Sequence, residues 1–413
     1  MTRTALLLCC LGVTPAVRGQ ADATDYDRDL VVLKPDKAVL CRILRVEDKQ
    51  LVTLQGSREV VIKKDQVVRF ERSLDLCEEF LKRAEKYEKA RDAGGLLQLA
   101  GWCEEKRLRK FAQNCYLGIL LLDPEHETAH KALKHIQGPK GWLVPFKGAN
   151  LPFAEVCKRR SDWGSAWELS SLHYDLRTDA PLLRGLQLLR DLEWFYLTFF
   201  ALFGDPLSLD DRTERMVAHV YRDYAKVPKA ASNVAAFFDP AARTLYTGFE
   251  GARTEGFPVA LDHEATHMVF FHTLRFRATG GSVPGWLDEG LAEYVRSVLL
   301  RQAPGSEPKV EPGRREDAYF KTAASGRDYR IERLITMEAT DFAASSGQAE
   351  KYANAYAWVH YLQFGEGGAW QRKFLDFVRE AYAGKGTSST FKKLMGGDLE
   401  KMKKGFETYV RGR

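Results

Sequence analysis

Two histidines and a glutamate in one five-residue run are the residues in this sequence best suited to chemistry. The run His263-Glu264-Ala265-Thr266-His267 has the form H-E-x-x-H. At 3.6 residues per turn, His263 and His267 lie one turn apart on the same face of a helix, so both imidazoles can reach one zinc ion. Glu264 lies beside that face and can hold a water molecule next to the metal. We therefore predict a zinc site with Glu264 as its general base.

A second segment, residues 284–294, supplies carboxylates at helical spacing. Catalytic zinc needs three protein ligands and one open position, so we expect Glu289 to be the third ligand. Glu293 follows one helical turn later and is expected to orient a ligating imidazole from outside the ligand shell. The alternative interpretation is a pair of solvated carboxylates on a surface helix.

The two segments together resemble the gluzincin zinc metallopeptidases, which include thermolysin and the aminopeptidase N group. The resemblance covers roughly residues 168–413, and the layout is similar to that of secreted bacterial gluzincin-like proteins with helical-repeat segments. It implies His263, His267 and Glu289 as zinc ligands, Glu264 as base, and a peptide or protein as substrate. These are expectations that the resemblance supplies.

A third segment, residues 352–362, resembles the aminopeptidase stretch that begins with a catalytic tyrosine. The resemblance implies that Tyr352 donates a hydrogen bond to the oxyanion that forms during hydrolysis. Tyr356 is the alternative donor and His360 a weaker one. A core aromatic on an amphipathic helix is the other interpretation of Tyr352.

The run Ala236-Phe237-Phe238 occupies the place where aminopeptidases of this group have a G-x-M-E-N strand, which pairs with extended substrate. Their glutamate binds the free amino group of the substrate. Here the matching residue is Phe238, which cannot pair with an ammonium ion as a carboxylate does. Asp239 is shorter and would point to the opposite face of a strand. We therefore predict endopeptidase rather than aminopeptidase action, unless Phe238 is only a hairpin core residue and the amine site lies elsewhere.

Two other functions are compatible with the sequence. The chain could be a non-catalytic binding or scaffold protein with a structural zinc site, in which the N-terminal segments do the work. It could also be a zinc hydrolase of a non-peptide amide or ester. The presence of all three ligands together with the glutamate base argues against an inactive enzyme.

The elements that position these residues indicate an α+β fold for residues 153–413. Segments 168–177, 216–221, 235–239 and 244–248 have strand-like patterns, and a long helix is expected to start near Pro181. A small sheet would then lie beside the H-E-x-x-H helix, and a helical lobe would supply Glu289 and Tyr352. Whether residues 301–330 form a lid stays open.

The segments before residue 153 contain no candidate catalytic residues. Short β-branched runs in residues 26–72 predict a small SH3-like β-barrel. Residues 73–137 change to a helical period and include a Leu-Asp-Pro turn, which resembles one tetratricopeptide unit and a possible docking site for a protein partner. Residues 138–152 are expected to be a linker. His126, His130 and His135 are interpreted as surface residues.

The N-terminus indicates the compartment. Residues 1–19 have a positive start, a short apolar core and small residues before Gln20, which is typical of a secretory signal peptide. We therefore predict a secreted, periplasmic or cell-envelope protein without a transmembrane anchor. The chain has 413 residues and a net charge of +6, with both signs interspersed, which does not favour nucleic-acid binding. Five cysteines follow the signal peptide; one disulfide is possible, and the sequence does not choose it.

Overall fold

The computed structural model describes residues 29–412, apart from 57, 212–213, 229–235, 250–257, 259, 275–282, 300–313, 326–329, 345 and 397–398. Within this part of the chain, helices combine with three β-sheets, which confirms the α+β class. The predicted signal peptide, residues 1–19, and more than half of the segment 301–330 lie outside the described residues. None of the described helices is both long enough and apolar enough to cross a bilayer.

The N-terminal sheet is antiparallel and has the strand order β4-β3-β2-β1-β5. Its strands are β1 (Asp29–Leu33), β2 (Lys37–Val46), β3 (Gln50–Gln55), β4 (Arg58–Lys63) and β5 (Val67–Glu71). Val31, Cys41, Ile43, Leu51 and Ile62 form a small apolar core of its own. The predicted strands are therefore present, and residues of β1, β2, β3 and β4 supply this core, whereas β5 has no fully buried residue.

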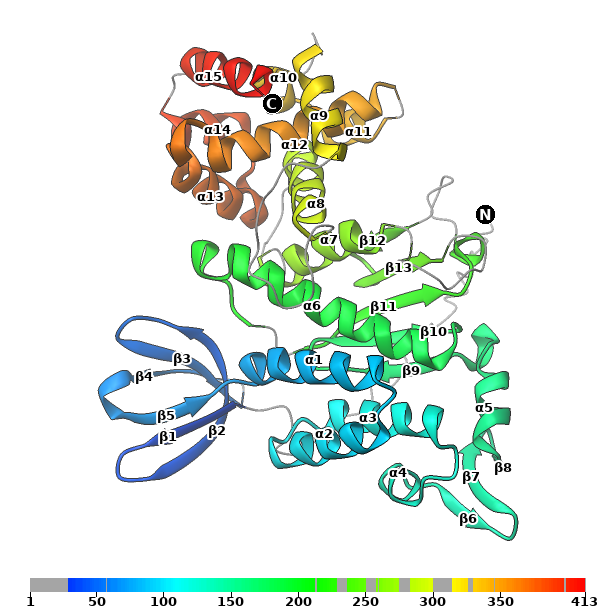
Figure 1. Ribbon diagram of the computed structural model, residues 1–413. Coiled ribbons are helices and arrows are strands. Elements are labelled where there is room, and N and C mark those ends of the chain that lie inside the picture. Colours follow the sequence, from blue (N-terminus) through cyan, green and yellow to red (C-terminus); the bar gives the residue numbers. More distant parts are fainter. Residues whose placement is uncertain are drawn as a thin grey trace, which may run out of the picture.

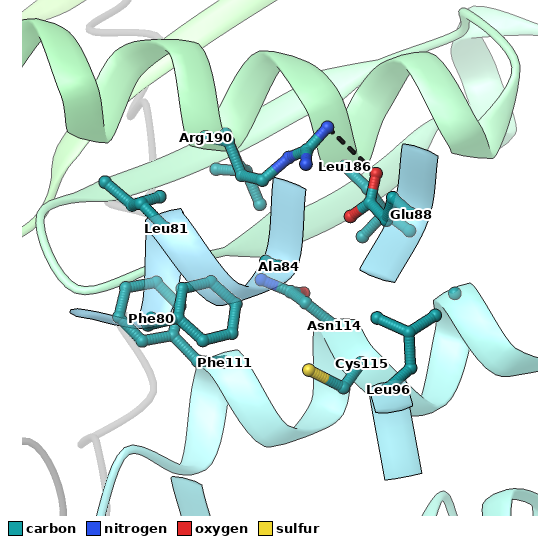
Figure 2. Close-up of a pocket in the computed structure, with 12 residues that line it drawn as sticks. Phe80, Leu81, Ala84, Glu88, Leu96, Phe111, Asn114, Cys115, Leu186 and Arg190 are labelled. Atoms are coloured by element: carbon teal, nitrogen blue, oxygen red, sulfur yellow. Dashed lines mark ion pairs between the residues drawn. The ribbon is translucent and has the colours of Figure 1, made fainter. Parts of the chain in front are cut away.

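Four helices follow this sheet. They are α1 (Ser73–Lys89), α2 (Ala93–Glu105), α3 (Arg109–Leu122) and α4 (Glu127–Ala132). Figure 2 shows where α1 and α3 meet the long helix α6 (Leu182–Leu207). The rings of Phe80 and Phe111 stack at 4.1 Å, and Arg190 pairs with Glu88 at 2.8 Å. The void between these helices has about 20 Å³, which is room for a single water molecule.

Residues 138–152, which we expected to be a linker, are folded. The strands β6 (Ile136–Gly138), β7 (Gly141–Phe146) and β8 (Ala149–Leu151) form a three-stranded antiparallel sheet, and α5 (Phe153–Arg159) follows. Gly141 and Gly148, which made this segment look like a linker, adopt left-handed φ angles of 120° and 80° at the two hairpin turns. The glycines therefore mark turns between strands that are too short to show a period.

The histidine cluster of α4 also differs from the expectation, because His130 is fully buried. Its ring stacks on Trp142 of β7 at 5.0 Å, and its two nitrogens contact His135 Nδ1 and the Pro124 carbonyl, each at 2.7 Å. Burial lowers the pKa of His135 to about 4. These histidines join α4 to the small sheet, and the interpretation of His130 as a surface residue is wrong.

The central sheet has the order β12-β13-β11-β10-β9. Its strands are β9 (Trp167–Ser170), β10 (Tyr174–Thr178), β11 (Met216–Tyr221), β12 (Phe237–Asp239) and β13 (Thr244–Gly248). The three inner strands are parallel, and β9 and β12 are antiparallel edge strands. The long helix α6 (Leu182–Leu207) starts after Pro181, as predicted, and α7 (Leu261–Thr273) contains the H-E-x-x-H run.

The C-terminal lobe is helical, and Figure 1 shows α7 between it and the central sheet. The helices are α8 (Gly285–Leu299), α9 (Arg314–Ser325), α10 (Ile331–Leu334), α11 (Ala339–Ala343), α12 (Gln348–Phe364), α13 (Gln371–Glu380), α14 (Ser388–Met395) and α15 (Leu399–Arg411). A Cβ atom at Gly290 would lie 2.7 Å from the Ala355 carbonyl oxygen. Because the glycine next to Glu289 has no side chain, α12 can lie directly against α8.

A buried ionic network joins the N-terminal sheet to the central sheet and α6. His173 Nδ1 lies 2.6 Å from Glu193 of α6, and its Nε2 lies 3.2 Å from Asp211. Arg42 of β2 pairs with the same Asp211 at 3.5 Å, and Tyr196 donates to it at 2.8 Å. Burial lowers the pKa of His173, but Glu193 and Asp211 outweigh it and raise the pKa to about 9. His173 is therefore an imidazolium at neutral pH.

This network predicts a loss of stability at alkaline pH. A histidine whose folded pKa exceeds its unfolded value contributes stability that is complete below about pH 6.5 and is lost as the pH rises through about 9. We expect the unfolding free energy to fall by about 2–3 kcal/mol more between pH 7 and 10 in the native chain than in a His173→Asn variant. Urea unfolding measures the difference, and an NMR titration of the ring checks its midpoint. A ring that is neutral at pH 7 would contradict the assignment.

Candidate metal centre

Helix α7 places both motif histidines on one face, next to the lobe. The helix begins at Leu261, after Ala260 in the left-handed region at φ 50°. His263 Nε2 and His267 Nε2 lie 3.2 Å apart, with the two rings at 73°. His263 is buried and His267 nearly so. Two imidazole nitrogens therefore converge on one point, as the i, i+4 spacing predicted.

Helix α8 brings Glu289 to the same point. Its Oε2 atom lies 2.9 Å from His263 Nε2 and 3.6 Å from His267 Nε2. Three donor atoms that each lie about 2.0–2.1 Å from a tetrahedral ion are about 3.3–3.4 Å apart. Of the three observed separations, 2.9 and 3.2 Å are shorter than this value and 3.6 Å is longer. These residues form a group that could hold a metal ion, and two imidazoles with one carboxylate are a donor set that suits a catalytic metal.

The second nitrogen of His263 faces Glu293, one turn after Glu289. The distance from His263 Nδ1 to Glu293 Oε1 is 3.1 Å, and the carboxylate is nearly fully buried. The Tyr319 hydroxyl of α9 donates to the other oxygen of Glu293 at 2.9 Å. A carboxylate that accepts from Nδ1–H fixes the ring and leaves Nε2 as the metal-binding atom. Glu293 therefore lies beside the ring, and its role in orienting His263 stays a prediction.

The second nitrogen of His267 has a matching partner that the sequence analysis missed. Asp288 Oδ1 lies 3.3 Å from His267 Nδ1, and Tyr382 donates to that same oxygen at 2.6 Å. Asp288 immediately precedes Glu289, so the two carboxylates point to different sides of α8. The available signal was the Asp-Glu pair itself, because adjacent acids on one helix turn can serve one ligand position and one supporting position.

The electrostatics of the centre favour added positive charge. Burial lowers the pKa of His263, but Glu289 and Glu293 outweigh it and raise the pKa to about 9. Burial likewise opposes protonation of His267, yet Asp288 and Glu289 hold its pKa well above its usual value. Burial would raise the pKa of Glu289, but the two imidazoles hold it well below its usual range. The carboxylates thus outweigh the burial cost of a cation, whether a proton or a metal ion.

Glu264 lies beside the three donors, against the edge strand of the central sheet. The Phe238 amide of β12 donates to Glu264 Oε2 at 2.9 Å. Burial raises the pKa of Glu264, although both histidines act in the opposite direction. A carboxylate with a raised pKa is a better proton acceptor, which suits a general base.

The predicted substrate strand lies at this edge, but its side chains point elsewhere. The Phe238 ring packs 5.4 Å from Phe271 of α7, and the Phe237 ring stacks on Tyr246 at 4.9 Å. Ala236, just before β12, is buried. Because the Phe238 amide points away from β13 and toward Glu264, the backbone of this edge, rather than the two phenyl rings, faces the metal centre.

Tyr352 is the aromatic residue that reaches the centre from α12. Its hydroxyl is close enough for Glu289 and Gln348 to shift its pKa, and its ring lies 6.3 Å from that of His263. Burial and the Glu289 charge raise the pKa of Tyr352, so the phenol keeps its proton. Gln348, a second residue that sequence reasoning missed, lies one turn before Tyr352 on the same face.

The two alternative donors lie in the core of the lobe. Tyr356 is buried beside Phe320 at 5.6 Å, and His360 Nδ1 bonds to the Tyr409 hydroxyl at 2.8 Å. Their place on α12 is one and two turns beyond Tyr352, farther from the triad along the helix. The structure therefore brings Tyr352, and not these two residues, next to Glu289.

Comparison with known proteins matches one segment of the chain to a family model of unknown function. Residues 259–381 match a family model described as "Protein of unknown function (DUF1570)". This segment contains the three donor residues, Glu264 and Tyr352. No curated protein and no solved structure matches the chain.

Proposed function

We propose that this protein is a zinc-dependent metallopeptidase of the gluzincin type. The observation that supports this most directly is the arrangement of His263, His267 and Glu289, whose donor atoms are spaced as on one tetrahedral ion. Each imidazole is also backed by a carboxylate on its other nitrogen. Such outer partners set the tautomer that a metal ligand needs.

The residues around the donors have the roles that peptide hydrolysis requires. Zinc, when bound, would act as a Lewis acid and lower the pKa of a water molecule toward about 7. Glu264 accepts the proton from the attacking water and passes it to the leaving amine. Tyr352 donates a hydrogen bond to the developing oxyanion, and Gln348 holds the hydroxyl in place. The edge strand β12 aligns an extended peptide by strand pairing.

The finer assignments of the fold and the compartment belong to the same proposal. Residues 153–413 form a gluzincin-like domain, residues 29–71 an SH3-like barrel, and α1–α4 a unit like a tetratricopeptide repeat. The sequence-based expectation of a signal peptide in residues 1–19 places the chain outside the cytoplasm. A peptide or protein is the substrate.

The decisive experiment combines metal analysis with hydrolysis of a mixed peptide library by the purified chain. We expect about one zinc ion per chain and cleavage that a chelator removes and zinc restores. Zinc binding without cleavage of any peptide would favour a structural zinc site in a binding protein. Hydrolysis of model esters or amides in place of peptides would favour a different zinc hydrolase.

The edge strand predicts that a free amino terminus is not required. Phe238 has no carboxylate, and Asp239 uses its own carboxylate to accept from the amides of Ala241 and Ala242 at 2.8 and 3.2 Å. We expect a peptide and its N-acetylated form to be cleaved with kcat/KM values within about threefold of each other, a difference below 1 kcal/mol. Mass spectrometry of the two digests measures this. Loss of cleavage on acetylation would show an aminopeptidase.

A Tyr352→Phe variant should be a slow enzyme that binds substrate normally. Removing one oxyanion donor lowers kcat by about 10²–10³ and leaves KM nearly unchanged. The Tyr356→Phe variant is the matched control, because that hydroxyl belongs to the core of the lobe and its loss should leave kcat unchanged. Normal kcat in folded Tyr352→Phe protein would make Tyr352 a packing residue.

A further inference from the structure

A large groove separates the N-terminal sheet from α6, away from the metal centre. It encloses about 1180 Å³ and is bounded by the β2–β3 turn, the end of β5, the first turns of α1 and the last turns of α6. This volume exceeds the usual range of small-molecule pockets, about 300–1,000 Å³. A peptide segment fits such a space better than a metabolite does.

The groove is acidic although the chain as a whole is basic. Six carboxylates and two guanidinium groups line it, whereas the net charge of the chain is +6. Four of the six carboxylates have cationic partners, because Arg45 pairs with Glu47, Arg72 with Asp75, Lys82 with Glu78 and Arg42 with Asp211. Asp48 and Asp205, on opposite walls, are exposed. The negative charge of the groove that lacks an ion-pair partner among the described residues is therefore that of Asp48 and Asp205.

The carboxyl end of α6 adds to this charge. The last turn of α6 contains no basic residue, and Asp205 lies there, where a cation would be favourable. Arg379 of α13 reaches the Pro206 carbonyl oxygen at 3.2 Å. The groove side of this turn consists of Gly204, Asp205 and Ser208. Because Arg379 already supplies one positive group at this helix end, a cation in the groove would be favoured mainly by the Asp205 carboxylate.

Apolar side chains occupy the groove between the carboxylates. Leu74, Leu197 and Phe200 are half-buried there, and Phe70 is 37% exposed. A large aromatic residue exposed beside other apolar groups is typical of an interaction surface. Acidic groups around apolar ones match a segment that has basic and apolar faces.

We propose that this groove is a docking site for a cationic amphipathic segment of a partner protein. Its occupant leaves the metal centre open, because Phe199 and Phe203 on the other side of α6 pack against Phe270 of α7 at 4.7 and 5.2 Å. The groove therefore recruits a partner or a protein substrate and takes no part in the chemistry. The proposed docking function of the groove does not depend on whether the metal centre hydrolyses peptides.

The test uses the full chain and a labelled peptide of about 14 residues, in which leucines at helical spacing alternate with lysines. Fluorescence anisotropy at low salt should show saturable binding that weakens as salt screens the charges. Asp48→Asn with Asp205→Asn should weaken binding at least about tenfold. The matched control, Asp36→Asn with Glu407→Gln, removes the same charge from exposed residues outside the groove and should bind normally.

A second pair of variants tests the apolar part. Phe70→Ser should weaken binding about tenfold, whereas Val61→Ser, at a residue that is 56% exposed on the same sheet but outside the groove, should not. Equal binding of a peptide with glutamate in place of lysine, or no binding at all, would overturn the proposal. So would a dimer that the groove variants dissociate, because the occupant would then be a second copy of this chain.

Discussion

The double variant His263→Ala, His267→Ala should lose its zinc, falling from about one ion per chain to below about 0.1. Both Nε2 atoms lie within 3.6 Å of Glu289 Oε2, so their removal leaves a single carboxylate at the centre. One carboxylate cannot hold zinc against dialysis. Atomic absorption on dialysed protein gives the stoichiometry.

The same variant should also lose the stabilisation that zinc gives the native chain. A ligand that binds only the folded state adds about 2.7 kcal/mol at one hundred times its dissociation constant, and Tm rises accordingly. The matched control is His126→Ala with His135→Ala, which removes two histidines near α4 and should keep both the metal and the zinc-dependent rise in Tm. Full zinc occupancy in the His263→Ala, His267→Ala protein would refute the assignment.

The relative positions of the two histidines in the candidate triad could be predicted because they depend on local geometry. The i, i+4 spacing of His263 and His267 fixes their relative positions on any helix, and the same rule relates Glu289 to Glu293. The contact between His267 and Asp288 depends instead on how α8 is rotated against α7. That rotation is set by packing between helices, including the close approach of the Ala355 carbonyl to Gly290. Such packing cannot be predicted from a local sequence pattern. Asp288 and Gln348 were missed for this reason.

The fold could be predicted where elements are long and periodic. The strands of the first sheet and the start of α6 at Pro181 follow directly from their patterns. The sheet at residues 136–151 could not, because strands of three to six residues show too little alternation. His130 is buried by Trp142, which belongs to one of those short strands, so its polar character alone indicated exposure.

The Glu264→Gln variant should separate metal binding from turnover. Glu264 accepts the Phe238 amide at 2.9 Å, and a glutamine carbonyl oxygen can accept the same bond, so the local structure should be retained. Glutamine cannot take up a proton, so kcat should fall by about 10²–10⁴, the usual contribution of a general base. The zinc content should stay near about one ion per chain, because Glu264 is not one of the three donors.

A loss of turnover with unchanged zinc content and unchanged structure is specific to a general base. A residue that only stabilises the fold would change the unfolding midpoint together with activity, and a ligand would change metal content. Glu350→Gln, an exposed position in the first turn of α12, is the matched control and should change neither turnover nor metal content. Turnover of Glu264→Gln within about twofold of the native chain, less than 1 kcal/mol in the barrier, would mean that another group accepts the proton. In that event the peptidase mechanism proposed above would be wrong even if zinc is bound.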